Sequence, residues 1–259
     1  MTDSRFGELT SHRSRARFAE LLKVQVKLAV REPYGLLAGI GLPVVLLAVF
    51  GFIGRQVPGN VGDTGLTIID LWTPTILVIA FIFIAISLPN TLIRDREIGW
   101  LRRVSTAPLH PSMLLAAQLA IDLALAAAAI VVIIGGGALV FGAALHVQIL
   151  SFGVSLLLAI AEIFALGLAL VALVPTQTVA SVVGGGVTFV LLFLAGLWVQ
   201  PGQVGGPLQT IMYYSPSGAA VRALLEATFN GSPSYAALLT MAVYTVIFGF
   251  LAIRYFRWE

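Results

Sequence analysis

Long apolar runs alternate with short polar segments along the whole chain. Six of the runs hold enough consecutive apolar residues to cross the roughly 30 Å hydrocarbon core of a bilayer as helices. A helix satisfies its own backbone hydrogen bonds, which lipid cannot do. The pattern therefore predicts an all-α membrane protein with six transmembrane helices, at residues 36–53, 71–93, 113–140, 149–174, 179–199 and 237–253.

Residues 1–35, before the first predicted span, mix apolar and basic side chains. Phe18, Leu21 and Leu22 lie close to Lys23 and Lys27. A helix here would have an apolar face and a basic face, which suits a position in the plane of the membrane interface. We predict an amphipathic interfacial helix. The alternative, a solvated and partly disordered arm, would carry fewer apolar residues.

The remaining residues, 36–259, are predicted to form one transmembrane domain, in which the segment 200–236 separates the fifth and sixth spans. Its Pro-Gly, Gly-Gly-Pro and Gly-Ser-Pro sequences are turn signals. Residues 208–214 and 219–229 between them are mostly apolar but too short to cross a bilayer. We expect two short helices that re-enter the outer leaflet, or a small external cap.

Composition agrees with a membrane protein: 59% of the 259 residues are hydrophobic and 10% are charged. Soluble domains average about 25% charged residues. Because this chain has far fewer, we expect membrane lipid to surround it. The net charge of +3 could suggest nucleic acid. No basic patch is interleaved with aromatic residues or Gly loops, as such modules require, and we expect no nucleic-acid partner.

The distribution of basic residues predicts the orientation. All but two of the 15 lysines and arginines lie before the first span, between the second and third spans, or after the sixth, which leaves Arg55 and Arg222 for the other side. Positively charged loops stay in the cytoplasm. We therefore expect a multi-pass protein of the bacterial inner membrane, with both termini and the loop 94–112 in the cytoplasm and the segment 200–236 outside.

The sequence carries no motif for catalysis or for binding a cofactor. No GxxxxGK[ST] phosphate loop occurs, and Lys23 and Lys27, its only lysines, lie outside any Gly-rich loop. His12, His110 and His146 are isolated on different segments, and there is no cysteine, so we expect no metal site. We predict that the chain alone has no catalytic residues and cannot hydrolyse a nucleotide.

The predicted cytoplasmic loop 94–112 has the pattern of a docking surface. Its apolar residues at helical spacing are Ile98, Leu101 and Val104, and its charged residues include Asp95, Glu97, Arg102 and Arg103. Such a helix offers an apolar face and charges for a polar partner. An ordinary positive-inside loop, the alternative, explains the arginines but not the acidic residues or Gly99.

Asp122 and Glu162 are the only acidic residues well inside the predicted spans. A rise of about 1.5 Å per residue places both roughly 14–18 Å from the cytoplasmic ends, where they could face each other. An ionised carboxylate there costs a few kcal/mol or more. Two interpretations remain open: a polar patch in the translocation pathway, for a cationic amphiphile or interhelical coupling, or structural hydrogen bonds to Gln118, Ser155 or a carbonyl.

Two motifs resemble a known family. Glu97, Gly99, Leu101 and Pro108 resemble the E-x-G-(x)-L-(x)n-P signature of permease subunits of ABC-2 type exporters, which include daunorubicin-resistance, Nod-factor and polysaccharide exporters. Residues 214–222, Tyr-Ser-Pro-Ser-Gly-Ala-Ala-Val-Arg, are similar to the family's Pro-(x)n-Ala-x-Arg element. The resemblance covers the whole chain. It departs at Trp100, where Thr or Ser is common, and at Arg102, where an acidic residue often stands.

The resemblance implies a transporter of two permeases, identical or paralogous, with two copies of a separate ATP-binding subunit that holds ATP and Mg. It implies export of a hydrophobic or amphipathic compound, such as a drug, a lipid-like molecule or a glycolipid. By analogy, the residues that couple to the ATPase are Arg94, Glu97, Gly99, Leu101, Arg102 and Arg103. The alternative function is a proton-coupled secondary transporter that uses Asp122 and Glu162 as a proton relay. An intramembrane enzyme is disfavoured because no HExxH or nucleophile-base pair is visible.

Overall fold

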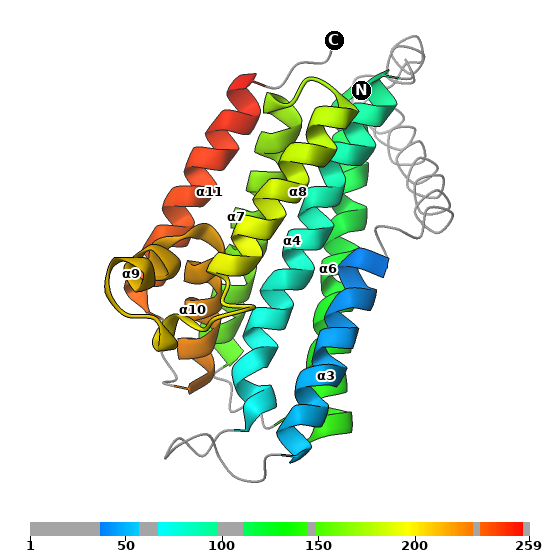
Figure 1. Cartoon of the computed structure of the whole chain (residues 1–259). Coiled ribbons are helices and arrows are strands. Elements are labelled where there is room, and N and C mark those ends of the chain that lie inside the picture. The colour runs from blue at the N-terminus through cyan, green and yellow to red at the C-terminus, as the bar shows by residue number, and fades with distance from the viewer. Residues whose placement is uncertain (1–36, 57–66, 98–110, 144–148, 230–233, 256–259) are drawn as a thin grey trace, which may run out of the picture.

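The computed structural model describes residues 37–56, 67–97, 111–143, 149–229 and 234–255, and every regular element in these ranges is a helix (Figure 1). Six helices are long and apolar enough to cross a membrane. They are α3 (Leu42–Gln56) with the π-helical turn η1 (Leu37–Gly41) before it, α4 (Ile68–Glu97), α6 (Pro111–Phe141), α7 (Ile149–Leu173), α8 (Gln177–Leu194) and α11 (Tyr235–Tyr255). The predicted all-α fold with six spans is confirmed. The predicted interfacial helix at 1–35 lies outside the described residues.

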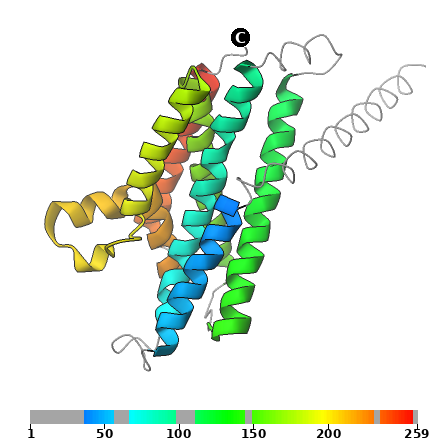
Figure 2. The ribbon, with the colours of Figure 1, turned by 45° about the vertical axis from the view of Figure 1, so that its right-hand side comes forward.

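The six spans run alternately up and down in chain order, so that α4, α7 and α11 run in one direction and α3, α6 and α8 in the other. In Figure 1, α4 ends, α6 begins, α7 ends, α8 begins and α11 ends at the upper end of the bundle. The lower end holds the end of α3, the start of α4 and the end of α6. The connection from α7 to α8 therefore belongs to the upper end, which Figure 2 shows from another side.

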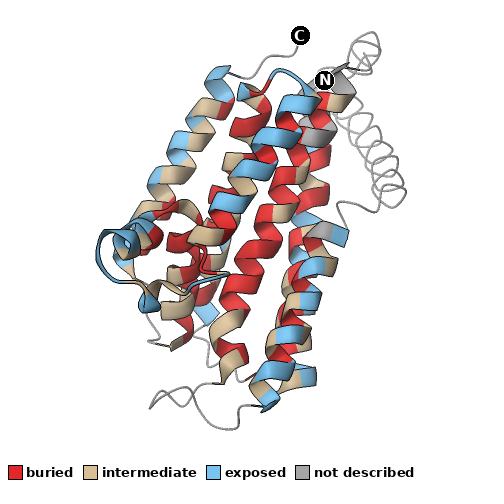
Figure 3. Cartoon of the chain, viewed as in Figure 1, coloured by how far each residue is buried: buried red, intermediate tan, exposed pale blue. Residues whose placement is uncertain are grey.

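The helix α4 forms the centre of the bundle. It packs against α3, α6, α7, α8 and α10. Its membrane-crossing window is 81% buried, against 17% for α11 and 22% for α3, α6 and α8 (Figure 3). The side chains from Ile76 to Ile82 are completely buried. A helix that is apolar on all sides is stable only when it is covered all round, which explains why this one is central. The other helices leave apolar faces for lipid.

The fifth predicted span is wrong at its C-terminal end, because α8 ends at Leu194 rather than at 199. Gly196 has a φ of +86°. Its N–H donates to the carbonyl oxygen of Phe193 at 3.0 Å, and the N–H of Leu197 donates to that of Leu192 at 3.2 Å. These two bonds form a Schellman motif, which ends a helix where glycine takes the left-handed conformation. The apolar run continues through the turn, so hydrophobicity alone does not show where the helix ends.

Two short helices follow α8 and the 3-10 turn η3 (Pro201–Gln203). They are α9 (Gly206–Tyr214) and α10 (Pro216–Phe229), where the sequence predicts two short helices. The helix α9 projects from the side of the bundle (Figure 2), while α10 packs against α7 and α11. Most residues of α10 from Ser217 to Thr228 are buried. Their depth relative to a membrane stays a prediction.

Candidate functional site

A hydrogen-bonded corner joins the end of α8 to the start of α10. The hydroxyl group of Ser217 donates to the carbonyl oxygen of Leu191, 26 residues earlier, at 2.7 Å, and both groups are buried. This carbonyl group is in the last turn of α8, and its oxygen also accepts the N–H of Ala195 at 2.8 Å. The Ser217 bond is therefore a second, long-range bond to this carbonyl group, and it fixes where α10 enters the bundle.

The start of α10 depends on Ser215 and Gly218. The Ser215 hydroxyl donates to the carbonyl oxygen of Met212 at 2.8 Å and accepts the N–H of Gly218 at 3.1 Å. A serine that accepts an N–H from the first turn is a helix N-cap. A Cβ atom on Gly218 would overlap the Met212 carbonyl oxygen. The sequence Ser-Pro-Ser-Gly at 215–218 therefore builds a tight turn between α9 and α10 that needs both the hydroxyl group and the glycine.

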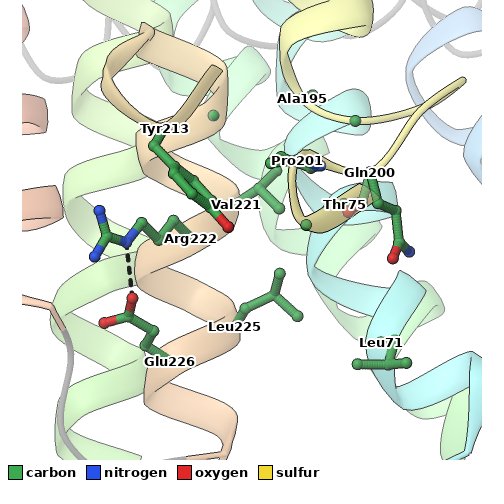
Figure 4. Close-up of a pocket in the computed structure, with 13 residues that line it drawn as sticks. Leu71, Thr75, Ala195, Gln200, Pro201, Tyr213, Val221, Arg222, Leu225 and Glu226 are labelled. Atoms are coloured by element: carbon green, nitrogen blue, oxygen red, sulfur yellow. Dashed lines mark hydrogen bonds and ion pairs between the residues drawn. The ribbon is translucent and has the colours of Figure 1, made fainter. Parts of the chain in front are cut away.

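A pocket of about 330 Å³ lies beside this corner (Figure 4). Its walls come from the first turns of α4, the chain between α8 and α9, the end of α9 and one face of α10. Its polar side chains are Thr75, Gln200, Tyr213, Arg222 and Glu226. Hence three segments distant in sequence bring polar groups to one concave surface, which is what a small-molecule site requires.

Arg222 and Glu226 form an ion pair one turn apart on α10. The Nε atom of Arg222 donates to the Oε1 atom of Glu226 at 2.7 Å, and the two side chains are 27% and 28% exposed. The guanidinium carbon lies 5.0 Å from the centre of the Tyr213 ring. Burial disfavours the charge of Arg222, but the bonds and attraction of Glu226, followed by those of Tyr214, outweigh it and raise the pKa of Arg222 above its ordinary value.

Asp122 and Glu162 are both buried near the middle of their helices. Asp122 is 1% exposed, and its two carboxylate oxygens accept long bonds of 3.4 Å from the Nε2 atom of Gln118. Glu162 is 0% exposed, and neither of its oxygens has a partner among the described residues. The Ser155 hydroxyl, two turns earlier on the same face of α7, is also buried without a partner there. The inside of this bundle therefore holds polar groups whose hydrogen-bonding capacity is unused.

The two carboxyl groups lie at matching depths but do not bond to each other. Each is eleven residues, or about 16 Å, from the upper end of its helix, measured from Pro111 and from Leu173. Their helices pack along α4, and α7 approaches it closely at Gly167, where a Cβ atom would be 2.5 Å from the Ala85 carbonyl oxygen. Glu162 points about 140° away from that side of α7. Besides α4, the helices packed on α7 are α10 and α11, and α8 makes a smaller contact with it.

The sequence model of the ABC-2 type transporter family matches residues 16–229. The chain belongs to this family. No individual curated protein matches it. Membership makes the chain the permease subunit of an ABC-type transporter and a multi-pass membrane protein. ABC-2 permeases lack the ATPase domain and generally act with an ATP-binding subunit.

Only part of the permease's predicted coupling loop lies within the described residues. Glu97 is the last residue of α4, although its side chain is not described, and Arg94 is half-buried one turn earlier. Gly99, Leu101, Arg102 and Arg103 lie outside the described residues. The two described ends that flank the loop, the end of α4 and the start of α6, lie at the same end of the bundle. Its docking role stays a prediction.

The sequence analysis does not predict the pocket in the permease, although one signal for it exists. Glu226 is the fourth residue after Arg222, in the segment 200–236 that has no other charge, and this i, i+4 spacing places two side chains on the same helical face. Thr75 and Gln200 give no comparable signal. Their contribution depends on the turn after α8, which brings the chain back toward α4.

Proposed function

We propose that this permease is the membrane-spanning subunit of an ATP-driven exporter for a hydrophobic or amphipathic compound, taken from the cytoplasm or the inner leaflet. Two copies of a separate ATPase, holding ATP and Mg, and a second permease, identical or paralogous, complete the transporter. The observation that carries the proposal is the family match over residues 16–229, on a chain with six apolar helices and no phosphate-binding loop.

In this proposal the upper end of the bundle faces the cytoplasm of a bacterial cell. The excess of basic residues before α3, between α4 and α6, and after α11 supports that orientation. A cysteine introduced at Ser105 should then be protected from an impermeant thiol reagent in intact cells, and one at Gln203, which is exposed in η3, should be labelled. The chain has no cysteine of its own, so the background is low. The opposite labelling pattern would reverse the orientation.

Energy would enter through the loop between α4 and α6. Closure of the ATPases would push on the segment that contains Glu97, Gly99 and Leu101. Since α4 packs against five other helices, including α10, displacement of its upper end would be transmitted through the bundle. The permeases would then alternate between inward-open and outward-open states, and Asp122 and Glu162 would lie along the route of the cargo.

Reconstitution tests this function and separates it from a proton-coupled transporter. The permease and its partner ATPase are placed in liposomes with a cationic amphiphilic dye, and dye movement is followed after addition of ATP and Mg. We expect movement that requires ATP, is lost with a hydrolysis-deficient ATPase and persists with an uncoupler. Dye movement driven by a proton gradient without ATP, and abolished by the uncoupler, would favour the proton relay instead.

A further inference from the structure

The face of α10 that lines the pocket carries one positive side chain, Arg222, and one negative side chain, Glu226. Arg222 and Glu226 bond to each other through one nitrogen and one oxygen, Nε and Oε1. A guanidinium group has five N–H donors and a carboxylate has two acceptor oxygens. After the ion pair has formed, each group therefore keeps bonding capacity for a ligand of the opposite charge, and Figure 4 shows the two side chains adjacent on one wall.

The rest of the pocket is suited to a ligand that is polar at one end only. Leu71, Pro201, Val221 and Leu225 supply apolar walls, while Gln200 adds an amide group. A volume of about 330 Å³ is at the lower end of the range for ligand pockets, which is about 300–1,000 Å³. It holds a head group with the first carbons of a chain, but not a whole two-chain lipid.

The surroundings of the pocket indicate where such a ligand comes from. Trp198, Ile211 and Tyr214, on the segments that build it, are 51%, 57% and 48% exposed. Exposed Trp and Tyr residues concentrate at the depth of lipid head groups, where an apolar ring meets lipid and its polar atom meets water. A partly exposed ion pair among exposed apolar side chains fits the same depth. The molecules available there are amphiphiles.

We propose that this pocket binds the zwitterionic head group of an amphiphile, with its phosphate or carboxylate group on Arg222 and its ammonium group on Glu226. A ligand with one charge would meet one attraction and one repulsion from the pair, whereas a zwitterion can satisfy both. The proposal adds a ligand class to the proposed function. Binding by the isolated permease does not require ATP-driven export, so the two are tested separately.

The test uses the purified full-length permease in a non-ionic detergent. Three probes share the same two short chains: dihexanoyl phosphatidylethanolamine is zwitterionic, dihexanoyl phosphatidylglycerol is anionic, and dihexanoylglycerol is uncharged. We expect the zwitterionic probe to bind most tightly. Arg222→Gln and Glu226→Gln should each weaken its binding by about tenfold or more, the range for a lost charged hydrogen bond. Arg254→Gln, at an exposed position on α11 outside the pocket, should leave binding of the zwitterionic probe unchanged.

A variant that fills the pocket guards against effects of the charge changes on folding. Gly202 lines the pocket, and a Cβ atom there would meet nothing within 4 Å. Gly202→Phe should therefore fold normally, keep the ion pair and still lose zwitterion binding. Unchanged affinity in this variant or in both charge variants would overturn the proposal, as would equal affinity of the wild-type protein for all three probes.

The source of the ligand follows from transport of the same probe in liposomes with the ATPase. ATP-driven movement of the zwitterionic probe, lost in Gly202→Phe, would assign the pocket to the cargo. Binding without such movement would assign it to a bilayer lipid, and either result keeps the site. If no compound moves with ATP while the probe still binds, the proposed function fails and the binding site stands.

Discussion

The hydroxyl group of Ser217 at the start of α10 donates a hydrogen bond to the carbonyl oxygen of Leu191 at the end of α8, at 2.7 Å. Both partners are buried, so the bond is shielded from water. It connects a helix on the outside of the bundle to one that packs among α4, α7 and α11. The pocket lies beside this connection, and its shape therefore depends on how α8 and α10 meet.

Removal of this hydroxyl group should lower stability measurably. Ser217→Ala removes one of the two hydrogen bonds that the Leu191 carbonyl oxygen accepts, the other being from the N–H of Ala195, and the loss of one such bond costs about 0.5–1.5 kcal/mol. We expect a lower midpoint of thermal unfolding in detergent. Thr240→Val is a matched control, because Thr240 donates to Ala236 within its own helix at a more exposed position, and it should change the midpoint little. Equal shifts in the two variants would contradict the special role of the α8–α10 corner.

Gly218, in the first turn of α10, should tolerate no side chain. Gly218→Ala places a methyl group where the Met212 carbonyl oxygen lies, and forced displacement in a packed region costs about 1–3 kcal/mol. We expect poor yield or a clearly lower unfolding midpoint. Gly249→Ala in α11 meets nothing within 4 Å and should be neutral or slightly stabilising, because alanine favours helix more than glycine does. Normal stability of Gly218→Ala would show that the turn between α9 and α10 can relax.

The sequence predicts well which segments span the membrane, but it predicts poorly which helices pack against each other, and the two results have different physical reasons. A span must be long and apolar whatever it touches, and α7 accordingly begins at Ile149 as predicted. The end of α8 was missed because Gly196 turns the chain within an apolar run. The depth of Glu162 follows from residue counting. Residue counting does not show which helix the Glu162 side chain faces. Contacts among six apolar helices depend on shape complementarity, which the pattern of hydrophobic residues does not encode.

The same distinction applies to the candidate sites. The predicted coupling residues follow from a linear motif, and two of them, Arg94 and Glu97, lie in the last turn of α4. Arg222 was recognised as part of a motif, but its partner Glu226 was not, although the spacing of four residues predicts such a pair. Thr75 and Gln200 come from segments that only the fold brings to the pocket. Local pairs can thus be read from sequence, whereas sites built from distant segments cannot.

Charge reversal at Glu97 should reduce transport without affecting insertion. Glu97→Lys changes a charge at the end of α4, where the proposed contact with the ATPase is made, and a mismatched charge at a docking surface costs several kcal/mol. We expect ATP-driven transport to fall by about tenfold or more, with normal expression and weaker co-purification of the ATPase. Arg254→Glu, a charge reversal near the upper end of α11, should transport normally. Normal transport and assembly of Glu97→Lys would mean that the loop is only a linker.

The two buried carboxyl groups should respond differently to neutral substitution. Asp122 already accepts hydrogen bonds from the Gln118 amide group. Asp122→Asn retains a carbonyl oxygen that can accept from the same donor. We expect normal folding and export of both cationic and neutral dyes in this variant. Loss of export in Asp122→Asn, with the complex still assembled, would show that its charge is needed.

Glu162 has no such partner among the described residues, so its two buried oxygens have unused hydrogen-bonding capacity. Glu162→Gln keeps the size and hydrogen-bonding ability of the side chain but removes any charge. If Glu162 binds a cation, export of a cationic dye should fall by about tenfold, while export of a neutral dye of similar size and the unfolding midpoint should stay unchanged. The ratio of cationic to neutral export is the decisive quantity, because a general folding defect would lower both rates together. An equal ratio in the wild-type protein and in Glu162→Gln would rule out a charge role and leave Glu162 as a structural contact between helices.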